Sequence, residues 1–190
     1  MRSALLFVCS VLLASTGFAQ ALPFSADFTP GGRLRMRVRS GEVHIVGTDQ
    51  SRISVEATVK KGNPAIDFQV RMREKNGATE LRVSGGPKKD VTITVRIPRD
   101  TDLYARIPFG EVHVENVVGN KDIEMHAGDL TVAVGNSADY ARVDASVYTG
   151  ELDGHPFGEE HGGLFRSFKK SGNGRYRLHA HVGAGQLTLE

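Results

Sequence analysis

Apolar and polar residues alternate with a period of two along most of this chain, and no window of a dozen residues carries the apolar stripe of an amphipathic helix. Such alternation predicts strands with one buried and one exposed face. The segments that show it most clearly before Pro98 are residues 33–40, 53–59, 68–72, 81–83 and 91–97. Turn signals rich in glycine, asparagine and proline separate these segments, so we predict an all-β fold that begins with a β-meander.

A short phrase recurs along the chain: a glycine, then a polar or acidic residue, then alternating aliphatic residues. It occurs at residues 41–45, 110–114, 128–132, 150–152 and 185–189. From residue 110 onward the glycines are 18, 22 and 35 residues apart (110 to 128, 128 to 150, 150 to 185). The first two steps are close to the roughly 20-residue coil of a β-solenoid. We therefore predict a turn-plus-strand unit that repeats as a β-solenoid, with an insertion at residues 153–174.

The first 21 residues have the features of a secretory signal peptide: Arg2, an apolar stretch at residues 4–13 and small residues at 19–21. Residues 22–190 are then expected to form a single all-β repeat domain in the periplasm, on the cell surface or outside the cell. The only cysteine, Cys9, falls inside this signal, and the preceding Val8 disfavours a lipid anchor there. No later segment is apolar enough to predict a transmembrane helix.

Charge and composition exclude several classes of partner and chemistry. Lysine and arginine number 24 against 22 acidic residues, a formal net charge of +2, which argues against nucleic-acid binding. Tryptophan is absent and aromatic residues make up 7% of the chain, which argues against a cleft that stacks sugars or bases. Without a cysteine after the signal, thiol catalysis and thiolate metal sites are excluded.

Three stretches carry a resemblance to a known family: the opening strand that ends in residues 40–47, the phrase Val95-Arg96-Ile97-Pro98, and the closing segment at residues 182–187. Together with the signal peptide they resemble the bacterial family of unknown function named putative adhesins. The resemblance implies a right-handed, single-stranded β-helix or β-roll in the cell envelope, and it supplies no catalytic residues. We therefore expect a non-catalytic envelope protein with a structural or surface-contacting role.

Arginine occupies every second position from Arg33 to Arg39, and residues two apart project from the same face of a strand. Arg33, Arg35, Arg37 and Arg39 would form a basic ladder about 20 Å long. One hypothesis is that this ladder binds an anionic envelope glycan, such as lipopolysaccharide phosphate or an acidic exopolysaccharide. The alternative is a solvated face that is paired with Glu56 or other acids and protects a sheet edge.

His179 and His181 also share one strand face and are kept as candidate binding residues. His44 and His113 take the same place in two copies of the repeated phrase, which indicates a structural position. One loop combines the ligand types that zinc or copper accepts, namely Asp153, His155, Glu159, Glu160 and His161. Their spacing matches no metal signature, and we expect neither a metal nor another cofactor.

An enzyme of this class, such as a polysaccharide-acting β-helix enzyme, would need two or three carboxylates or a metal in a groove. The candidates are Asp129, Asp144 and Glu151. Two of them directly follow turn glycines, where short polar residues are common. The nucleophile-elbow phrase Gly-x-Ser-x-Gly is absent. We expect the protein not to be an enzyme.

Two further segments bear on partners. The insertion carries Phe165 and Phe168 among cations, and we expect both rings to close the last coil rather than to protrude toward a membrane or a partner. The sequence ends at Glu190, directly after the strand expected at residues 186–189. An open strand edge there would allow another protein, or a second copy of the chain, to add a strand.

Overall fold

Strands form nearly all of the regular structure in the computed structural model, which describes residues 22–59, 68–86 and 90–190, the side chains of residues 160–163 excepted. The strands are β1 (Phe24–Asp27), β2 (Arg33–Val38), β3 (Gly41–Thr48), β4 (Arg52–Val59), β5 (Phe68–Lys75), β6 (Ala78–Gly85), β7 (Val91–Pro98), β8 (Asp102–Glu115), β9 (Lys121–Val132), β10 (Tyr140–Gly154), β11 (Glu159–Ser171) and β12 (Tyr176–Leu189). Single 3₁₀ turns form η1 (Ser137–Asp139) and η2 (His155–Phe157). The signal peptide predicted at residues 1–21 lies outside the described residues. Within those residues, no helix has the length and apolar character needed to cross a bilayer.

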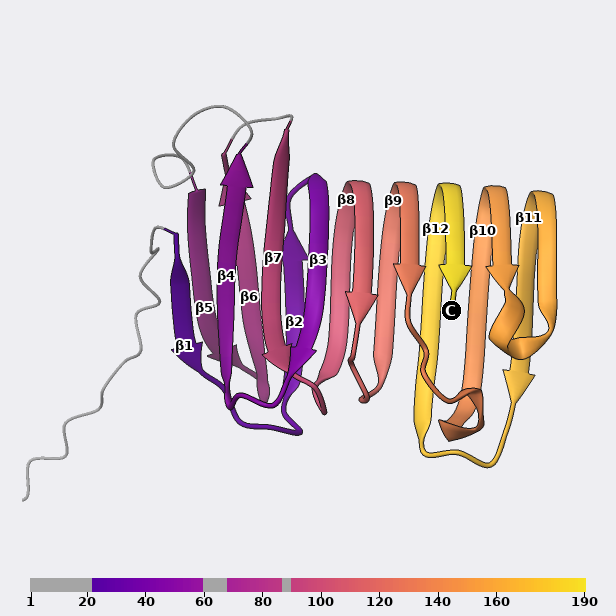
Figure 1. The fold of residues 1–190 in the computed structure, drawn as a ribbon, viewed down its shortest axis with the longest axis horizontal. Helices are drawn as coiled ribbons and strands as arrows, with labels where there is room; N and C mark the ends of the chain where they lie inside the picture. The colour runs from indigo at the N-terminus through magenta and orange to yellow at the C-terminus, as the bar shows by residue number, and fades with distance from the viewer. Residues whose placement is uncertain (1–21, 60–67, 87–89) are drawn as a thin grey trace, which may run out of the picture.

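The strands form one open, mixed sheet that folds over into two layers (Figure 1). Strand β8 shows how the layers are joined, because β2 pairs with its residues 102–106 and β3 pairs with its residues 110–115. The first layer runs β5, β6, β2 and then the N-terminal halves of β8, β9, β12 and β10. The second layer runs β1, β4, β7, β3 and then the C-terminal halves of the same long strands. The all-β prediction is therefore confirmed.

The repeated glycine phrase marks the bends at which each long strand passes from one layer to the other. Gly110, Gly128, Gly185 and Gly150 are aligned on neighbouring strands and have φ between +121° and +135°. A Cβ atom at any of them would lie 1.8–2.0 Å from a neighbouring glycine carbonyl oxygen. These bends line the upper edge of the right half of Figure 1. The glycines thus sit inside continuous strands rather than in turns that precede them, because the missing side chain lets adjacent bends stack in contact.

The strands that carry these bends do not stack in chain order. Strand β12 lies between β9 and β10 and pairs in parallel with both. Consecutive coils of a solenoid would instead place β10 next to β9. The insertion explains the difference, because it forms β11 antiparallel to β10 and returns the chain so that β12 enters the space between β9 and β10. The predicted open edge at residues 186–189 is therefore wrong, since Leu187 pairs with Leu130 on one side and Leu152 on the other.

The predicted N-terminal β-meander is also wrong. Among β1 to β7, the only strands that are consecutive in sequence and paired are β5 and β6. Strand β7 separates β3 from β4, and β2 and β3 belong to different layers. Alternation in the sequence identifies which face of a strand is buried, but it carries no information about which strand lies beside it.

The insertion closes one end of the sheet with only one of its two phenylalanines. Phe168 is buried and packs against Phe157, with ring centroids 6.1 Å apart. Phe165 is 67% exposed and, among aromatic rings of the described residues, contacts only Tyr148, which is also exposed. The prediction that both rings fold back therefore holds for Phe168 and fails for Phe165, which lies at the bend of β11 with φ +55°.

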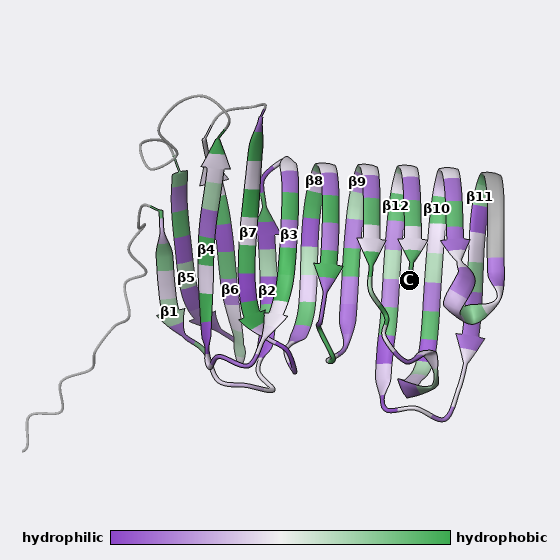
Figure 2. Ribbon diagram, in the orientation of Figure 1, coloured by the Kyte–Doolittle hydropathy of each residue, from purple (hydrophilic) through white to green (hydrophobic). Residues whose placement is uncertain are grey.

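The core lies between the two layers and contains aliphatic side chains from alternate positions of every long strand, as the bands in Figure 2 show. One charged residue of the described chain is buried in it: Lys121 is 2% exposed. Its Nζ donates a hydrogen bond to the Tyr140 hydroxyl at 2.7 Å, and that hydroxyl donates to the Val134 carbonyl oxygen at 3.0 Å. Burial lowers the pKa of Lys121 to about 8 and raises the pKa of Tyr140 to about 12.

These two pKa shifts predict a stability maximum near pH 10. Between about pH 8, the pKa of Lys121 in the folded state, and its ordinary value of 10.5, the unfolded state binds more protons than the folded state. The free energy of unfolding therefore rises by about 3 kcal/mol over this range. Above pH 10 the unfolded state loses the Tyr140 proton first, so stability falls again. Urea unfolding across this range measures the effect. The Lys121→Met variant should be more stable than wild type at neutral pH, and its unfolding free energy should not rise with pH. A rise of unchanged size in this variant would show that Lys121 is not its cause.

Candidate functional site

The predicted arginine ladder is present in part. Arg33, Arg35 and Arg37 are exposed on the outer face of β2. Arg39 lies beyond the end of β2, where its guanidinium donates a hydrogen bond to the Gly85 carbonyl oxygen at 2.7 Å and burial lowers its pKa. Arg39 is therefore a half-buried end to the strand rather than a fourth step of the ladder.

The alternative explanation of the ladder agrees with the structure in part, because Arg35 lies opposite Glu80 on β6 and Arg33 lies opposite Asp102 on β8. Strand β2 lies between β6 and β8, so its arginines do not protect a sheet edge. Glu56, the acid expected to pair with them, instead forms an ion pair with Arg96 at 2.8 Å in the second layer. Arg37, in contrast, lies between Arg82 and Arg106, so pairing with a directly opposite acid does not explain its position.

A row of four arginines crosses this ladder at a right angle. Arg71 on β5 is in register with Arg82 on β6, Arg82 with Arg37 on β2, and Arg37 with Arg106 on β8. Alternation places all four on the outer face of the first layer, where neighbouring strands are about 4.8 Å apart. The row therefore spans about 14 Å. We call these residues the arginine row.

The arginine row runs through a groove of about 680 Å³ on the outer face of the first layer. Arg35, Arg73, Lys75 and Tyr104 line the same groove, which we call the basic groove. Glu80 is the one carboxylate among its lining residues. A hydrogen bond from Arg73 is the largest cause that lowers the pKa of Glu80, and the charges of Arg73, Lys75 and Arg35 lower it further. The groove thus has a positive potential at the position of its single acid.

Most of the positive charge in the groove has no acidic partner. Arg73 pairs with Glu80 at 2.7 Å, and Arg106 pairs with Asp122 at 2.9 Å and Glu124 at 3.0 Å. Within the described part of the chain, Arg35, Arg37, Arg71 and Arg82 form no ion pair with a carboxylate. A guanidinium offers a planar set of donors that fits phosphate, sulfate or carboxylate oxygens in pairs. The arrangement can therefore hold several anionic groups at once.

The two candidate histidines lie on the same face but outside the groove. His179 on β12 is in register with Asp122 and Asp144, and His181 shares a hydrogen bond of 2.9 Å with Ser146 Oγ. His179, Asp122 and Glu124 are close enough to one another to hold a metal ion. Arg106 already supplies a cation to both carboxylates, which disfavours a metal at this cluster.

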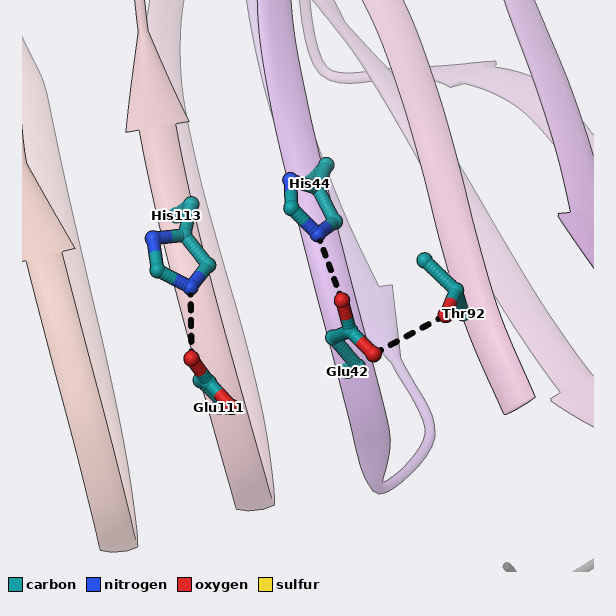
Figure 3. A network of polar contacts seen from close by, with 5 residues as sticks. All are labelled: Glu42, His44, Thr92, Glu111 and His113. Carbon is teal, nitrogen blue, oxygen red and sulfur yellow. Dashed lines mark hydrogen bonds and ion pairs between the residues drawn. The ribbon is translucent and has the colours of Figure 1, made fainter. Parts of the chain in front are cut away.

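A second polar network lies on the outer face of the second layer (Figure 3). His44 and His113 stack with ring centroids 5.0 Å apart, and each shares a 2.9 Å hydrogen bond with the glutamate two residues before it. Hydrogen bonds from His44 and Thr92 lower the pKa of Glu42. The repeated phrase places these residues side by side because β3 and β8 pair in register. The residues of this network are hydrogen-bonded to one another, consistent with the expected structural role.

The carboxylates considered for catalysis are not gathered into a site. Asp129 and Glu151 lie in the second layer with Gln186 of β12 between them, whereas Asp144 lies in the first layer. Of the loop proposed as a metal site, Asp153 accepts a hydrogen bond from the backbone of His155 at 2.9 Å. The side chains of Glu160 and His161 lie outside the described residues, so that ligand set remains untested.

Three residues of the arginine row were missed by the sequence analysis: Arg71, Arg82 and Arg106. Alternation does place each of them on the polar face of its strand. The missing information was the register between strands, because the row combines positions as far apart in the sequence as Arg37 and Arg106.

Comparison with known proteins identifies no family. No protein-family model matches this sequence, and no curated protein matches it. One similar solved structure is described as a putative cell adhesion protein from Clostridium sporogenes. It is 15% identical, with a TM-score of 0.49, over 90% of this chain and 99% of that chain. Similarity at this level establishes neither a shared family nor a shared function.

Proposed function

We propose that this protein is a non-catalytic binding module of the cell envelope that holds an anionic polymer, such as an acidic glycan, in the basic groove. The arginine row carries the proposal. Like charges directly opposite each other on neighbouring strands destabilise a sheet, and three of these four arginines have no carboxylate partner among the described residues. A bound polyanion would neutralise this repulsion, which gives the row a reason to be present.

The groove extends beyond the arginine row. Two residues along the strands, a step of about 7 Å, Arg73 and Arg35 lie on either side of Glu80, which pairs with Arg73 and leaves Arg35 as the further cation. The Tyr104 ring, half-buried beside Arg35, lies in the groove, with the guanidinium of Arg33 5.9 Å from its centre. This ring offers a flat surface against which a sugar can pack between two charged groups.

The proposal extends to location and architecture. The signal-peptide features of residues 1–21 and the resemblance to the putative-adhesin family support export to the envelope. The stacked glycine bends of β8, β9, β12 and β10 support a solenoid-like arrangement of the parallel strands. An adhesin-like protein of this kind would use the basic groove as its contact with a charged surface.

A structural role without a ligand is the second candidate. The network around His44 and His113 favours it, because its members bond to one another. The enzyme hypothesis stays third, because Asp144 lies in a different layer from Asp129 and Glu151. The two leading candidates differ in a measurable way, since only the binding module has a salt-dependent affinity for soluble polyanions.

Calorimetric titration of the purified protein with alginate and with inorganic tripolyphosphate tests the proposal. Binding should weaken markedly between about 20 mM and about 150 mM salt. The double variant Arg37→Gln/Arg82→Gln should lose about 100-fold in affinity. A matched control is Arg142→Gln/Arg177→Gln, which removes an in-register arginine pair from the same face outside the groove. Equal losses in both double variants, or no binding by wild type, would reject the proposal.

A further inference from the structure

A second hollow, of about 330 Å³, adjoins the basic groove. It forms where β2 ends at Val38 and the chain turns into the second layer. Beyond this point β6 continues to Gly85 and β8 continues through Ile107 and Pro108, with no strand between them. The absent strand leaves a depression between these two chain segments.

The hollow has a mainly apolar floor and a basic rim. Pro108 lines it, and Val38, Val83 and Ile107 lie at its base with only 1–2% of each residue exposed. Arg39 belongs to the rim, where its guanidinium is held by the Gly85 carbonyl oxygen. Arg37, Arg82 and Arg106 line both this hollow and the basic groove. These three arginines therefore form the boundary between a basic groove on one side and an apolar depression on the other. Glu124, which also lines the hollow, is paired with Arg106.

The apolar surface continues from the hollow to the bends. Pro108 and His126 line its outer end. The next residue of β8, Phe109, is 54% exposed and packs edge-on against His126, with centroids 6.3 Å apart. From Phe109 a line of in-register residues without charge crosses the bends, namely Ala127, Ala184, Thr149 and Leu164.

We propose that the ligand of the basic groove is an anionic amphiphile, whose phosphate or similar group binds Arg37, Arg82 and Arg106 and whose alkyl portion enters the adjoining hollow. This inference rests on the proposed function, because it uses the same arginines. A volume of about 330 Å³ is near the lower end of the range for small-molecule sites, about 300–1,000 Å³. The hollow therefore takes part of one alkyl chain, and the remainder follows the apolar line past Phe109.

Three soluble probes separate the contributions of charge and alkyl chain. Octyl phosphate below its micelle concentration carries both, methyl phosphate carries the charge alone, and tripolyphosphate tests the arginine row without an alkyl chain. Octyl phosphate should bind wild type at least about tenfold more tightly than methyl phosphate, because burial of each methylene is favourable. Ser84→Trp, which places a ring in the hollow, should abolish this difference and leave tripolyphosphate affinity unchanged. Ser167→Trp, at an exposed serine of β11 outside the hollow, is the matched control.

The outcomes distinguish this inference from the proposed function. Equal affinities for octyl and methyl phosphate, with tripolyphosphate still bound through Arg37 and Arg82, would overturn the amphiphile and leave the polyanion site intact. The same result follows if Ser84→Trp retains the full preference for octyl phosphate. Absence of binding by all three probes would overturn both.

Discussion

Gly128→Ala is expected to lower the free energy of unfolding by at least about 3 kcal/mol. Gly128 has φ +121°, and its added Cβ would lie 1.9 Å from the Gly110 carbonyl oxygen and 2.6 Å from Met125 Cε. The methionine end can move, but the carbonyl belongs to the adjacent bend and is fixed by its own strand pairing. Relief of this clash would therefore require β8 and β9 to separate at the bend.

Gly135→Ala provides the control for backbone conformation alone. Gly135 also has a positive φ, +68°, but no atom lies within 4 Å of the position of its Cβ. Alanine there should lower the free energy of unfolding by about 1–2 kcal/mol, the cost of placing a side chain on a left-handed backbone. Urea unfolding of the two variants separates the steric cost from the conformational cost. Similar losses in both would show that the stacked bends are not in the tight contact described.

The sequence predicted which face of each strand is buried, but it did not predict which strands lie side by side in the sheet. Alternation identified the buried face of β2. The glycine phrase identified positions with a special backbone conformation, such as Gly110 and Gly128, although these lie within strands and not in the predicted turns. Both signals are local, because they depend on residues one or two positions apart. The order of β9, β12 and β10 depends on how the insertion returns the chain, which no local pattern encodes.

The candidate site illustrates the same limit. The ladder on β2 was visible because Arg33, Arg35 and Arg37 are two residues apart in the sequence. Arg39 continued the alternation, but it is half-buried because its guanidinium is held by the Gly85 carbonyl oxygen at the end of β6. The arginine row was not visible, since it depends on the register of four strands. One-residue slips in that register would have moved each arginine away from its neighbour.

Arg37→Gln should make the protein more stable and a weaker binder at the same time. Arg37 lies between Arg82 and Arg106 in the arginine row, so its removal eliminates repulsion with both neighbours. The gain in unfolding free energy should be about 0.5–1 kcal/mol at low salt and should shrink as salt screens the charges. Affinity for tripolyphosphate should fall about tenfold, because charge-assisted hydrogen bonds to one guanidinium are lost.

The opposite signs of these two effects separate a binding site from a structural network. If Arg37 stabilised the fold through a partner, its replacement would lower stability, as expected for an ion-paired residue such as Arg96, whose guanidinium contacts Glu56 at 2.8 Å. Arg96→Gln is therefore the matched comparison, with slightly reduced stability and unchanged tripolyphosphate affinity. Urea unfolding and calorimetric titration of both variants, each at low and physiological salt, measure these effects. A loss of stability in Arg37→Gln comparable to that in Arg96→Gln would show that the arginine row is neutralised within the fold, and it would remove the electrostatic reason for a polyanion in the groove.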